Sequence, residues 1–320
     1  MKRFLLIFAL FIVLPVHAST EKFYQQVMIG NAESAVKAAQ ELTSAIQDSN
    51  QIPKKEFQEL IFSWKQVEAT YILSSLDGEY FELPWYLDMF HGNNEDIKVQ
   101  LDRILRGDSN IENALYKNSH KTINALEYVL YSYDLNSPRV KSALLIISKS
   151  IETRLLDILN GYKAYQEKFV SSRKISSSYL LNALVESSYK LKEWRVGDVA
   201  GLTRKYKEKA NNKRAEYHIS GNSALAIRAI LLAHMQAINS KKYDNFGDFA
   251  RDFEADKEID ITIDWLNNSI EIVGKIENDD LTGDVAEELY KSTSHLQDAY
   301  YLSLMNKLQF VSKILDADGD

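Results

Sequence analysis

The sequence PRVKSALLIISKSIETRLLDILNGYKAYQEKFV, residues 138–170, decides the fold class. Its large apolar residues recur every three or four positions, the period of an α-helix that buries one face. They are Val140, Leu144, Ile147, Ile151, Leu155, Ile158, Tyr162, Tyr165 and Phe169. A stripe that keeps this register over about 30 residues is typical of the spine of a helical bundle.

Apolar stripes with helical spacing also lie on both sides of this segment. They run through Met28–Ile46, Phe57–Ser75, Leu180–Leu191, Ile227–Ile238, Ile259–Val273 and Leu296–Leu315. Only four prolines and twelve glycines interrupt the chain, and no alternating strand pattern or GxGxxG turn occurs. We therefore predict an all-α protein.

The polar, serine-rich residues 171–178 are the best candidate for a linker. We place a domain boundary there, which divides the chain into an N-terminal helical bundle over residues 19–172 and a C-terminal helical bundle over residues 173–320. A functional cleft is expected between the two bundles.

The first 18 residues have the pattern of a secretory signal peptide. Lys2 and Arg3 precede an apolar run from Phe4 to Val16, and cleavage is expected after Ala18. Ser19 stands where bacterial lipidation needs cysteine, and the apolar run is too short for a membrane span. We predict a periplasmic protein without a membrane span in the mature chain.

Composition excludes several kinds of site. The chain has no cysteine, so it can form neither a disulfide nor a thiolate metal site. Its net charge is −7, and loss of Lys2 and Arg3 makes the mature chain more acidic. We expect no nucleic acid as a partner, and a cation or a cationic molecule fits this charge better.

A row of polar side chains stands beside an apolar stripe in the sequence NSHKTINALEYVLYSY, residues 118–133. His120, Asn124, Glu127 and Tyr131 share one side of the expected helix, next to Ile123, Leu126, Val129 and Leu130. Such groups are normally paired when they leave water. An ordinary amphipathic helix with a solvated polar face is the simpler interpretation.

Glu68 lies in the middle of the stripe that runs from Phe57 to Ser75. A lone buried carboxylate is costly, so Glu68 should meet a cation, a hydrogen-bond donor or a metal ion. Pairing with a nearby lysine or arginine at the edge of the stripe is the alternative to a metal.

Four residues make up the candidate metal site: Glu68, His120, Asn124 and Glu127. Their oxygen and imidazole ligands suit iron, calcium, manganese or zinc if they converge, and we expect an iron or zinc ion. The competing interpretation is a hydrogen-bonded polar cluster that fixes helix packing without any metal.

The other histidines and the basic segment have simpler explanations. His91 and His218 are expected in solvated loops, and His234 in the core. The charge-dense segment 194–221 is expected to be a solvated loop because aromatic stacking residues are sparse in it. There is no His-Glu-x-x-His, Gly-x-Ser-x-Gly, P-loop or EF-hand sequence, which argues against an enzyme.

Residues 122–130, TINALEYVL, resemble the Gly-x-His-x-x-Glu signature of the imelysin-like proteins. Glu127 matches the family glutamate, whereas Thr122 and Asn124 replace the glycine and the histidine. The segment 64–69, WKQVEA, resembles the first-helix segment of the family, and the loop around Pro84 and Trp85 resembles its Trp-Pro loop. Glu186, Ser187, Asp198, Gly201, Leu202 and Tyr206 resemble its second-half pattern weakly.

This resemblance implies two helical bundles, with the 122–130 helix lining the cleft between them. It also implies an exported binding or accessory protein of metal acquisition, iron above all, whose partners would be a metal ion or small ligand and an envelope protein of an uptake system. His120, one turn before Asn124, would take part of the role of the family histidine. A metal-dependent, peptidase-like hydrolase with Glu127 as general base and a helical adaptor for a protein partner are the alternatives.

Overall fold

The computed structural model describes residues 20–91 and 96–311. Most of these residues are helical and none is in a strand, which confirms the all-α prediction. The predicted signal peptide, residues 1–18, lies outside the described residues. Every helix within the described part of the chain is too short or too polar to cross a lipid bilayer.

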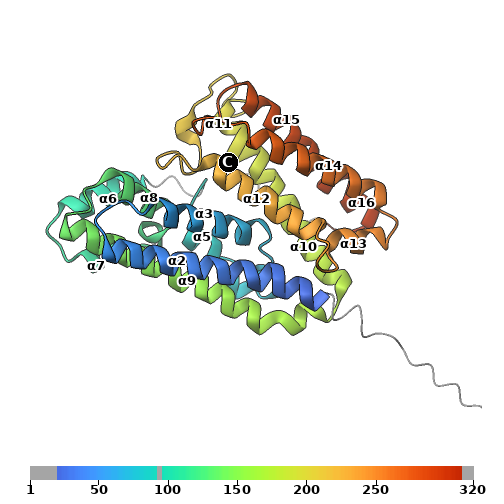
Figure 1. The fold of residues 1–320 in the computed structure, drawn as a ribbon, viewed down its shortest axis with the longest axis horizontal. Helices are drawn as coiled ribbons and strands as arrows, with labels where there is room; N and C mark the ends of the chain where they lie inside the picture. Colours follow the sequence, from blue (N-terminus) through green and yellow to red (C-terminus); the bar gives the residue numbers. More distant parts are fainter. Residues whose placement is uncertain (1–19, 92–95, 312–320) are drawn as a thin grey trace, which may run out of the picture.

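Three long helices form the first bundle: α2 (Gly30–Asp48), α3 (Lys54–Ala69) and α9 (Pro138–Val170), which lie side by side in Figure 1. Helix α9 is the predicted spine. It begins where the side chain of Ser137 accepts a hydrogen bond from the Val140 amide and Pro138 occupies the first turn, where no amide donor is needed. Small buried residues of α2, such as Ala35 and Ala39, let the neighbouring backbones approach closely.

Short helices connect α3 to α9, and several of them pack along α9. They are α4 (Leu73–Leu76), η2 (Gly78–Tyr80), α5 (Leu83–Leu87), α6 (Ile97–Arg106), α7 (Ile111–Ala114), η3 (Asn118–Lys121) and α8 (Ile123–Ser132). The stripe expected to run through Ser75 is broken, because α3 ends at Ala69 and Thr70 leaves the helical backbone conformation. After this break, α4 packs against α9.

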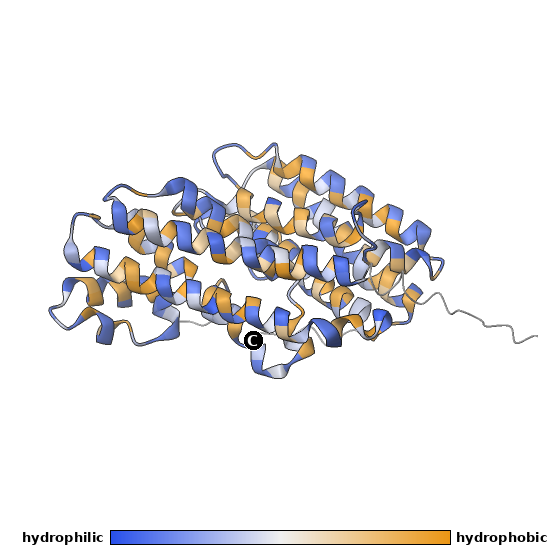
Figure 2. Ribbon diagram, turned by 60° about the horizontal axis from the view of Figure 1, so that its bottom comes forward, coloured by the Kyte–Doolittle hydropathy of each residue, from blue (hydrophilic) through white to orange (hydrophobic). Residues whose placement is uncertain are grey.

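The second bundle is built on α10 (Arg173–Lys190), α12 (Ser223–Ile238), α14 (Asp256–Val273) and α15 (Asp284–Asp298). Short elements complete it: α11 (Asp198–Ala200), η5 (Asn212–Arg214), α13 (Phe246–Arg251) and α16 (Met305–Leu308). Apolar residues concentrate where helices face one another and polar residues on the outer sides, as Figure 2 shows.

The linker predicted over residues 171–178 is wrong for most of its length, because α10 already begins at Arg173. The serines have structural roles at this corner. The side chain of Ser172 caps α10 by accepting a hydrogen bond from the Ile175 amide, and the hydroxyl of Ser176 donates to the carbonyl of Phe169. Small buried hydroxyls thus allow a tight turn between α9 and α10, and the domain boundary placed there stays a prediction.

The two bundles meet mainly where α3 packs against α12, with α10 beside them. Three π-helical segments occur in the described chain: η1 (Tyr24–Ile29), η4 (Leu191–Gly197) and η6 (Ala299–Leu304). A π-helical turn shifts the side chains that follow it around the helix axis, and such turns are frequent at functional sites. Segment η4 has this effect at the junction, where Arg195 reaches Glu68 of α3.

Candidate functional site

The ammonium group of Lys65 lies at the centre of the junction between the bundles. The side chain is fully buried, and Nζ lies 2.7 Å from a carboxylate oxygen of each of Glu68, Asp88 and Glu216. These groups come from α3, from the residue after α5 and from the loop before α12. Lys65 therefore ties together three segments that are far apart in the sequence.

Arg195 is the second buried cation of this cluster. Its Nε lies 2.8 Å from Glu216 and its Nη2 lies 2.9 Å from Glu68. Each of these two carboxylates is therefore shared between the guanidinium and Lys65. We call Lys65, Glu68, Asp88, Arg195 and Glu216 the ion network.

Mutual attraction compensates for the loss of water in the ion network. Burial alone would raise the pKa of Asp88, but Lys65 and the hydrogen bonds from Lys65 and Tyr217 hold it well below its ordinary value. Burial would also raise the pKa of Glu68, which Arg195 and Lys65 lower instead. For Glu216 burial prevails and the pKa is raised, which is consistent with three carboxylates facing two cations.

Neutral donors complete the coordination of Asp88. The hydroxyl of Tyr217 donates to Oδ2 over 2.5 Å, the indole of Trp64 donates to the same oxygen over 3.3 Å, and the Phe90 amide donates to Oδ1 over 3.0 Å. Tyr217 has a φ of 58°, a left-handed conformation that costs a bulky residue about 1–3 kcal/mol. Such strain is retained where the surrounding contacts fix the residue, and here the contact is with Asp88.

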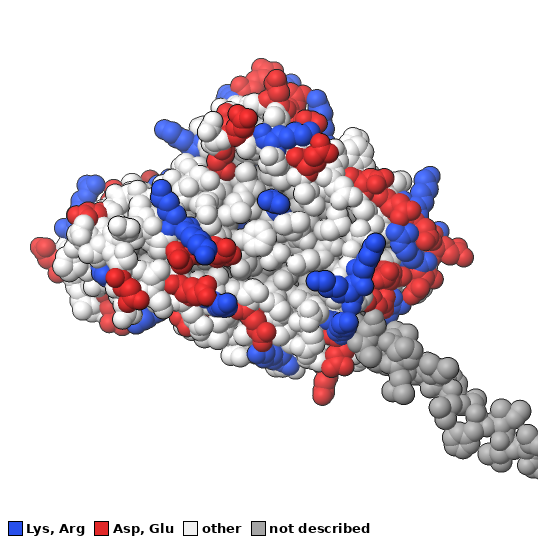
Figure 3. Space-filling model, in the orientation of Figure 1, with Lys and Arg blue, Asp and Glu red and all other residues white. Residues whose placement is uncertain are grey.

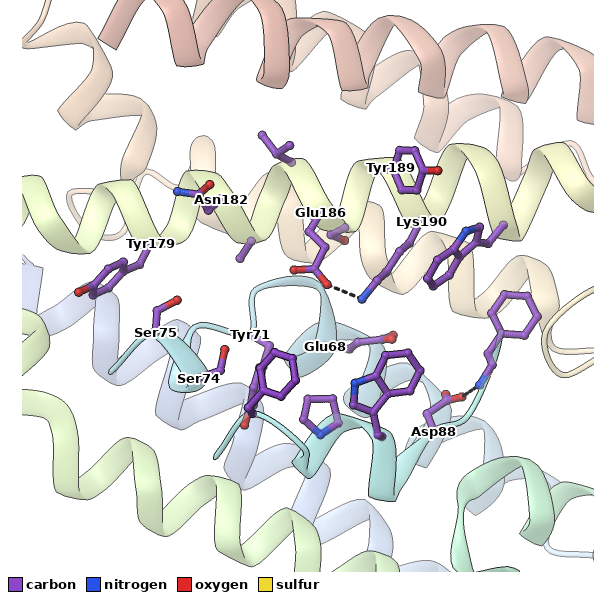
Figure 4. Close-up of a pocket in the computed structure, with 18 of the residues that line it drawn as sticks. Glu68, Tyr71, Ser74, Ser75, Asp88, Tyr179, Asn182, Glu186, Tyr189 and Lys190 are labelled. Carbon is purple, nitrogen blue, oxygen red and sulfur yellow. Dashed lines mark hydrogen bonds and ion pairs between the residues drawn. The ribbon is translucent and has the colours of Figure 1, made fainter. Parts of the chain in front are cut away.

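A pocket of about 290 Å³ adjoins the ion network and separates α10 and η4 from the α3–α5 region. Glu68, Asp88 and Arg195 form its inner wall, and aromatic residues form much of the remainder: Tyr71, Phe81, Trp85, Phe90, Tyr179, Tyr189 and Trp194. In Figure 4, Glu186 and Lys190 of α10 extend toward Glu68 and Tyr71 on the opposite side. Aromatic walls with a few convergent polar groups are the usual composition of a small-molecule site.

Charges at the molecular surface are mixed in sign. On the face seen in Figure 3, Lys and Arg alternate with Asp and Glu around the edges, and charged side chains are sparse over the middle. The basic residues of segment 194–221 include Arg195, which is almost completely buried. The prediction of a solvated loop is therefore wrong for Arg195, as it is for Glu216.

The four predicted metal ligands occupy different surroundings. Glu68 is in the ion network, so it has the lysine and arginine partners of the alternative interpretation. Asn124 Oδ1 accepts a hydrogen bond of 2.9 Å from the Met89 amide, one residue after Asp88. His120 instead points toward α6, where Nε2 lies 2.9 Å from Gln100 Oε1.

Glu127 is buried beside the loop that carries Glu216. Its Oε1 accepts hydrogen bonds from the amide and the hydroxyl of Ser220, at 2.9 and 2.7 Å. Burial raises the pKa of Glu127 to about 7, although the two hydrogen bonds from Ser220 oppose this shift. Glu127 thus contacts the segment 216–220 directly, whereas Glu68 is linked to Glu216 only through Lys65 and Arg195.

These donor sets do not fit a bare metal ion. Within residues 20–91 and 96–311, no three His, Asp or Glu side chains are placed to share a metal. The carboxylates that do converge are already bound by Lys65 and Arg195, and a metal ion would have to displace these cations. Breaking a buried ion pair is costly, because it leaves buried charges without partners.

Sequence reasoning missed Lys65, Asp88, Arg195 and Glu216. Lys65 stands next to Trp64 on the buried side of α3, and a lysine in that register was the available signal. Asp88 and Glu216 lie outside long helices, where periodicity is uninformative. Arg195 lies within η4, and the spacing of apolar residues in the sequence does not predict the π-helical register of this segment.

Two histidines have well-defined contacts. His234 is fully buried and contacts Tyr300 and Ser187 through its two ring nitrogens, at 3.1 and 2.9 Å, which confirms the expectation of a core histidine. His91 stacks on Trp194 at 4.9 Å between ring centroids, and its Nε2 lies 3.2 Å from Asp198. It therefore has defined partners beside the pocket.

Comparisons with known proteins agree with this architecture. The family model described as Imelysin (Peptidase_M75) matches residues 22–299. An imelysin-like protein from Psychrobacter arcticum 273-4 has a similar structure, with a TM-score of 0.74, 16% identity and coverage of 93% of this chain and 98% of that chain. No curated protein matches the sequence.

A second similar structure comes from Parabacteroides distasonis ATCC 8503 and is described as a "putative iron-regulated protein A precursor". Its TM-score is 0.72 at 12% identity, over 92% of this chain and 95% of that chain. At this level of identity, both structures establish a shared fold. Since the family model matches most of the sequence and both structures share its two-bundle architecture, the chain belongs to the imelysin family.

Proposed function

We propose that this protein is a binding protein of metal acquisition, with iron as the metal, and that its ligand occupies the pocket between the bundles. The observation that carries the proposal is the pocket itself. It is a cavity of about 290 Å³ with aromatic walls, and Glu68, Asp88 and Arg195 of the largely buried ion network line its inner side. Sites with this composition are typical of small-molecule binding.

The proposed ligand is a small molecule or a metal held by a small chelator, because the ion network leaves no place for a bare ion. Lys65 and Arg195 neutralise the carboxylates that a metal would need. The link to iron has its support in the family and in the printed description of the Parabacteroides protein as iron-regulated.

Export to the periplasm is part of the same proposal. Its support is the pattern of residues 1–18, where a basic start precedes an apolar run and a small-residue cleavage site. N-terminal sequencing of protein purified from the source cell should begin at Ser19. An intact Met1 would contradict export.

The binding proposal is tested by equilibrium dialysis of the purified mature protein against iron(III) citrate, with Ala183→Trp as the comparison. Ala183 lines the pocket from α10, so an indole at this position should occupy the cavity, and no residue of the ion network is replaced. Binding that the substitution abolishes supports the proposal. Protein purified from the source cell without any bound metal or small molecule, and equal iron binding by both forms, would overturn it.

The hydrolase and adaptor alternatives have less support. Glu127, the expected general base, has a pKa near neutrality, but it contacts Ser220 and is not among the described residues that line the pocket. A protein-binding role would need an exposed docking surface, and the feature that stands out at the junction is instead a pocket of small-molecule size.

A further inference from the structure

The pocket is lined by charged groups of both signs that can form further hydrogen bonds. On the basic side, the guanidinium of Arg195 uses Nε and Nη2 for Glu216 and Glu68, whereas Nη1 donates to none of the described residues. The side chain of Arg195 is 4% exposed and lines the pocket, so Nη1 is the donor that it can offer to a ligand. A ligand oxygen could therefore accept a hydrogen bond from it.

Lys190 is the second donor on the pocket wall. Its ammonium lies 2.5 Å from Glu186, and its side chain retains 24% exposure. Nζ also lies 5.9 Å from the ring centre of Trp85 and 5.6 Å from that of Trp194, so the two indoles hold it beside the cavity. An ammonium has three N–H donors, and the bond to Glu186 uses one.

Two carboxylates provide acceptors on the same pocket. The side chain of Glu186 is 55% exposed and that of Glu68 is 21% exposed, although both are already paired with cations. Each carboxylate oxygen has two lone pairs, so both groups can accept a further bond from a ligand ammonium. Figure 4 shows Glu186 and Glu68 on opposite sides of the cavity.

A ligand with a single charge could pair with only one kind of group on the pocket wall. An anion would use the donors and a cation the acceptors, and the groups of the other kind would gain no new partner. A ligand with one positive and one negative group adds no net charge and complements both kinds of wall.

We propose that the pocket binds a small aromatic zwitterion, that is, a free amino acid of the phenylalanine or tryptophan type. Its carboxylate would meet Arg195 and Lys190, its ammonium would meet Glu68 and Glu186, and its ring would pack among the aromatic walls beside Trp85. The volume of about 290 Å³ is at the lower end of small-molecule sites, which favours one amino acid over a larger peptide. This inference rests on the proposed function only in taking the pocket as the binding site.

Three ligands that differ in charge test the proposal by isothermal titration calorimetry. L-Phenylalanine carries both charges, 3-phenylpropionate only the carboxylate and phenethylamine only the ammonium. We expect each singly charged analogue to bind at least about tenfold more weakly than L-phenylalanine, because each loses a charge-assisted pair.

Matched variants assign the two ends of the ligand. Lys190→Met should weaken L-phenylalanine about tenfold and should not weaken phenethylamine, whereas Glu186→Gln should weaken L-phenylalanine and should not weaken 3-phenylpropionate. Both residues lie outside the ion network, so the fold should persist. Lys163→Met is the control, since Lys163 forms an exposed pair with Glu33 on the first bundle.

Each outcome of the titrations has a definite meaning. No binding of L-phenylalanine, or equal binding of all three ligands, overturns the zwitterion. If iron(III) citrate then still binds and Ala183→Trp abolishes that binding, the proposed function stands while this inference fails. If L-phenylalanine binds in the predicted pattern and no iron chelate does, the inference stands and the role in metal acquisition fails.

Discussion

Lys65 Nζ lies 2.7 Å from Glu216 Oε1 although 151 residues separate the two in the chain. One residue belongs to α3 of the first bundle, and the other belongs to the loop before α12 of the second. The same ammonium also binds Glu68 and Asp88, which line the pocket. Lys65 therefore links the two bundles and holds part of the pocket wall in place. Stability and binding should therefore depend on the same few side chains.

Replacement of Lys65 by methionine should destabilise the protein by about 3–5 kcal/mol, because three carboxylates lose a buried partner. The measurement is the free energy of unfolding in urea. Lys37→Met is the matched control, since Lys37 forms an exposed pair with Glu41 at 3.7 Å and should change stability by less than about 0.5 kcal/mol. Similar small effects from both substitutions would contradict a structural role of the buried ammonium.

A smaller side chain at position 65 should open a cation site. Three carboxylate oxygens surround the position of Nζ at 2.7 Å each, slightly longer than the 2.3–2.6 Å typical of calcium. Calcium should therefore raise the melting temperature of Lys65→Ala and not that of the wild type. An equal shift in both proteins would show that the wild-type network does not exclude metal ions.

Glu127 should make stability depend on pH. Its folded pKa of about 7 is raised by burial above the unfolded value, so the folded state keeps a proton that the unfolded state releases. Stability is therefore lost as pH rises from about 4.5 to about 7. Glu127→Gln stays neutral and can accept the same bonds from Ser220.

We compare the free energies of unfolding of Glu127→Gln and the wild type. The value for the variant minus that for the wild type should increase by about 2–3 kcal/mol between pH 5 and pH 8. Urea titrations of both proteins at the two pH values measure this difference. A difference that is constant with pH would mean that the carboxyl group is ionised in the fold throughout this range.

Gly197 ends the π-helical segment that positions Arg195. A Cβ atom there would lie 2.7 Å from Thr203 Cγ2 and 2.7 Å from Tyr290 Cε2, well inside van der Waals contact. Gly197→Ala should therefore destabilise the protein by about 1–3 kcal/mol, measured by thermal unfolding. Gly78→Ala, whose added Cβ meets nothing within 4 Å, is the control, and equal effects would contradict tight packing at η4.

The local sequence pattern was sufficient to predict the long helices but not the ion network. The stripe from Val140 to Phe169 repeats regularly and becomes α9, because burial of one helix face needs only local periodicity. The cost of burying a lone carboxylate correctly implied a partner for Glu68. One partner, Lys65, lies one helical turn earlier in α3, whereas the other, Arg195, is 127 residues away and is positioned by a register change in η4. Such long-range pairing leaves no periodic trace in the sequence.

The most direct test of the central claim is a double-mutant cycle between Lys65 and Glu216, with Lys65→Met, Glu216→Gln and the double variant compared in urea unfolding. The account predicts that the double variant is more stable than the sum of the single effects by at least about 2 kcal/mol, since the two buried charges depend on each other. Additivity within about 0.5 kcal/mol would show that the two side chains do not join the bundles, and the account of the pocket wall would fail.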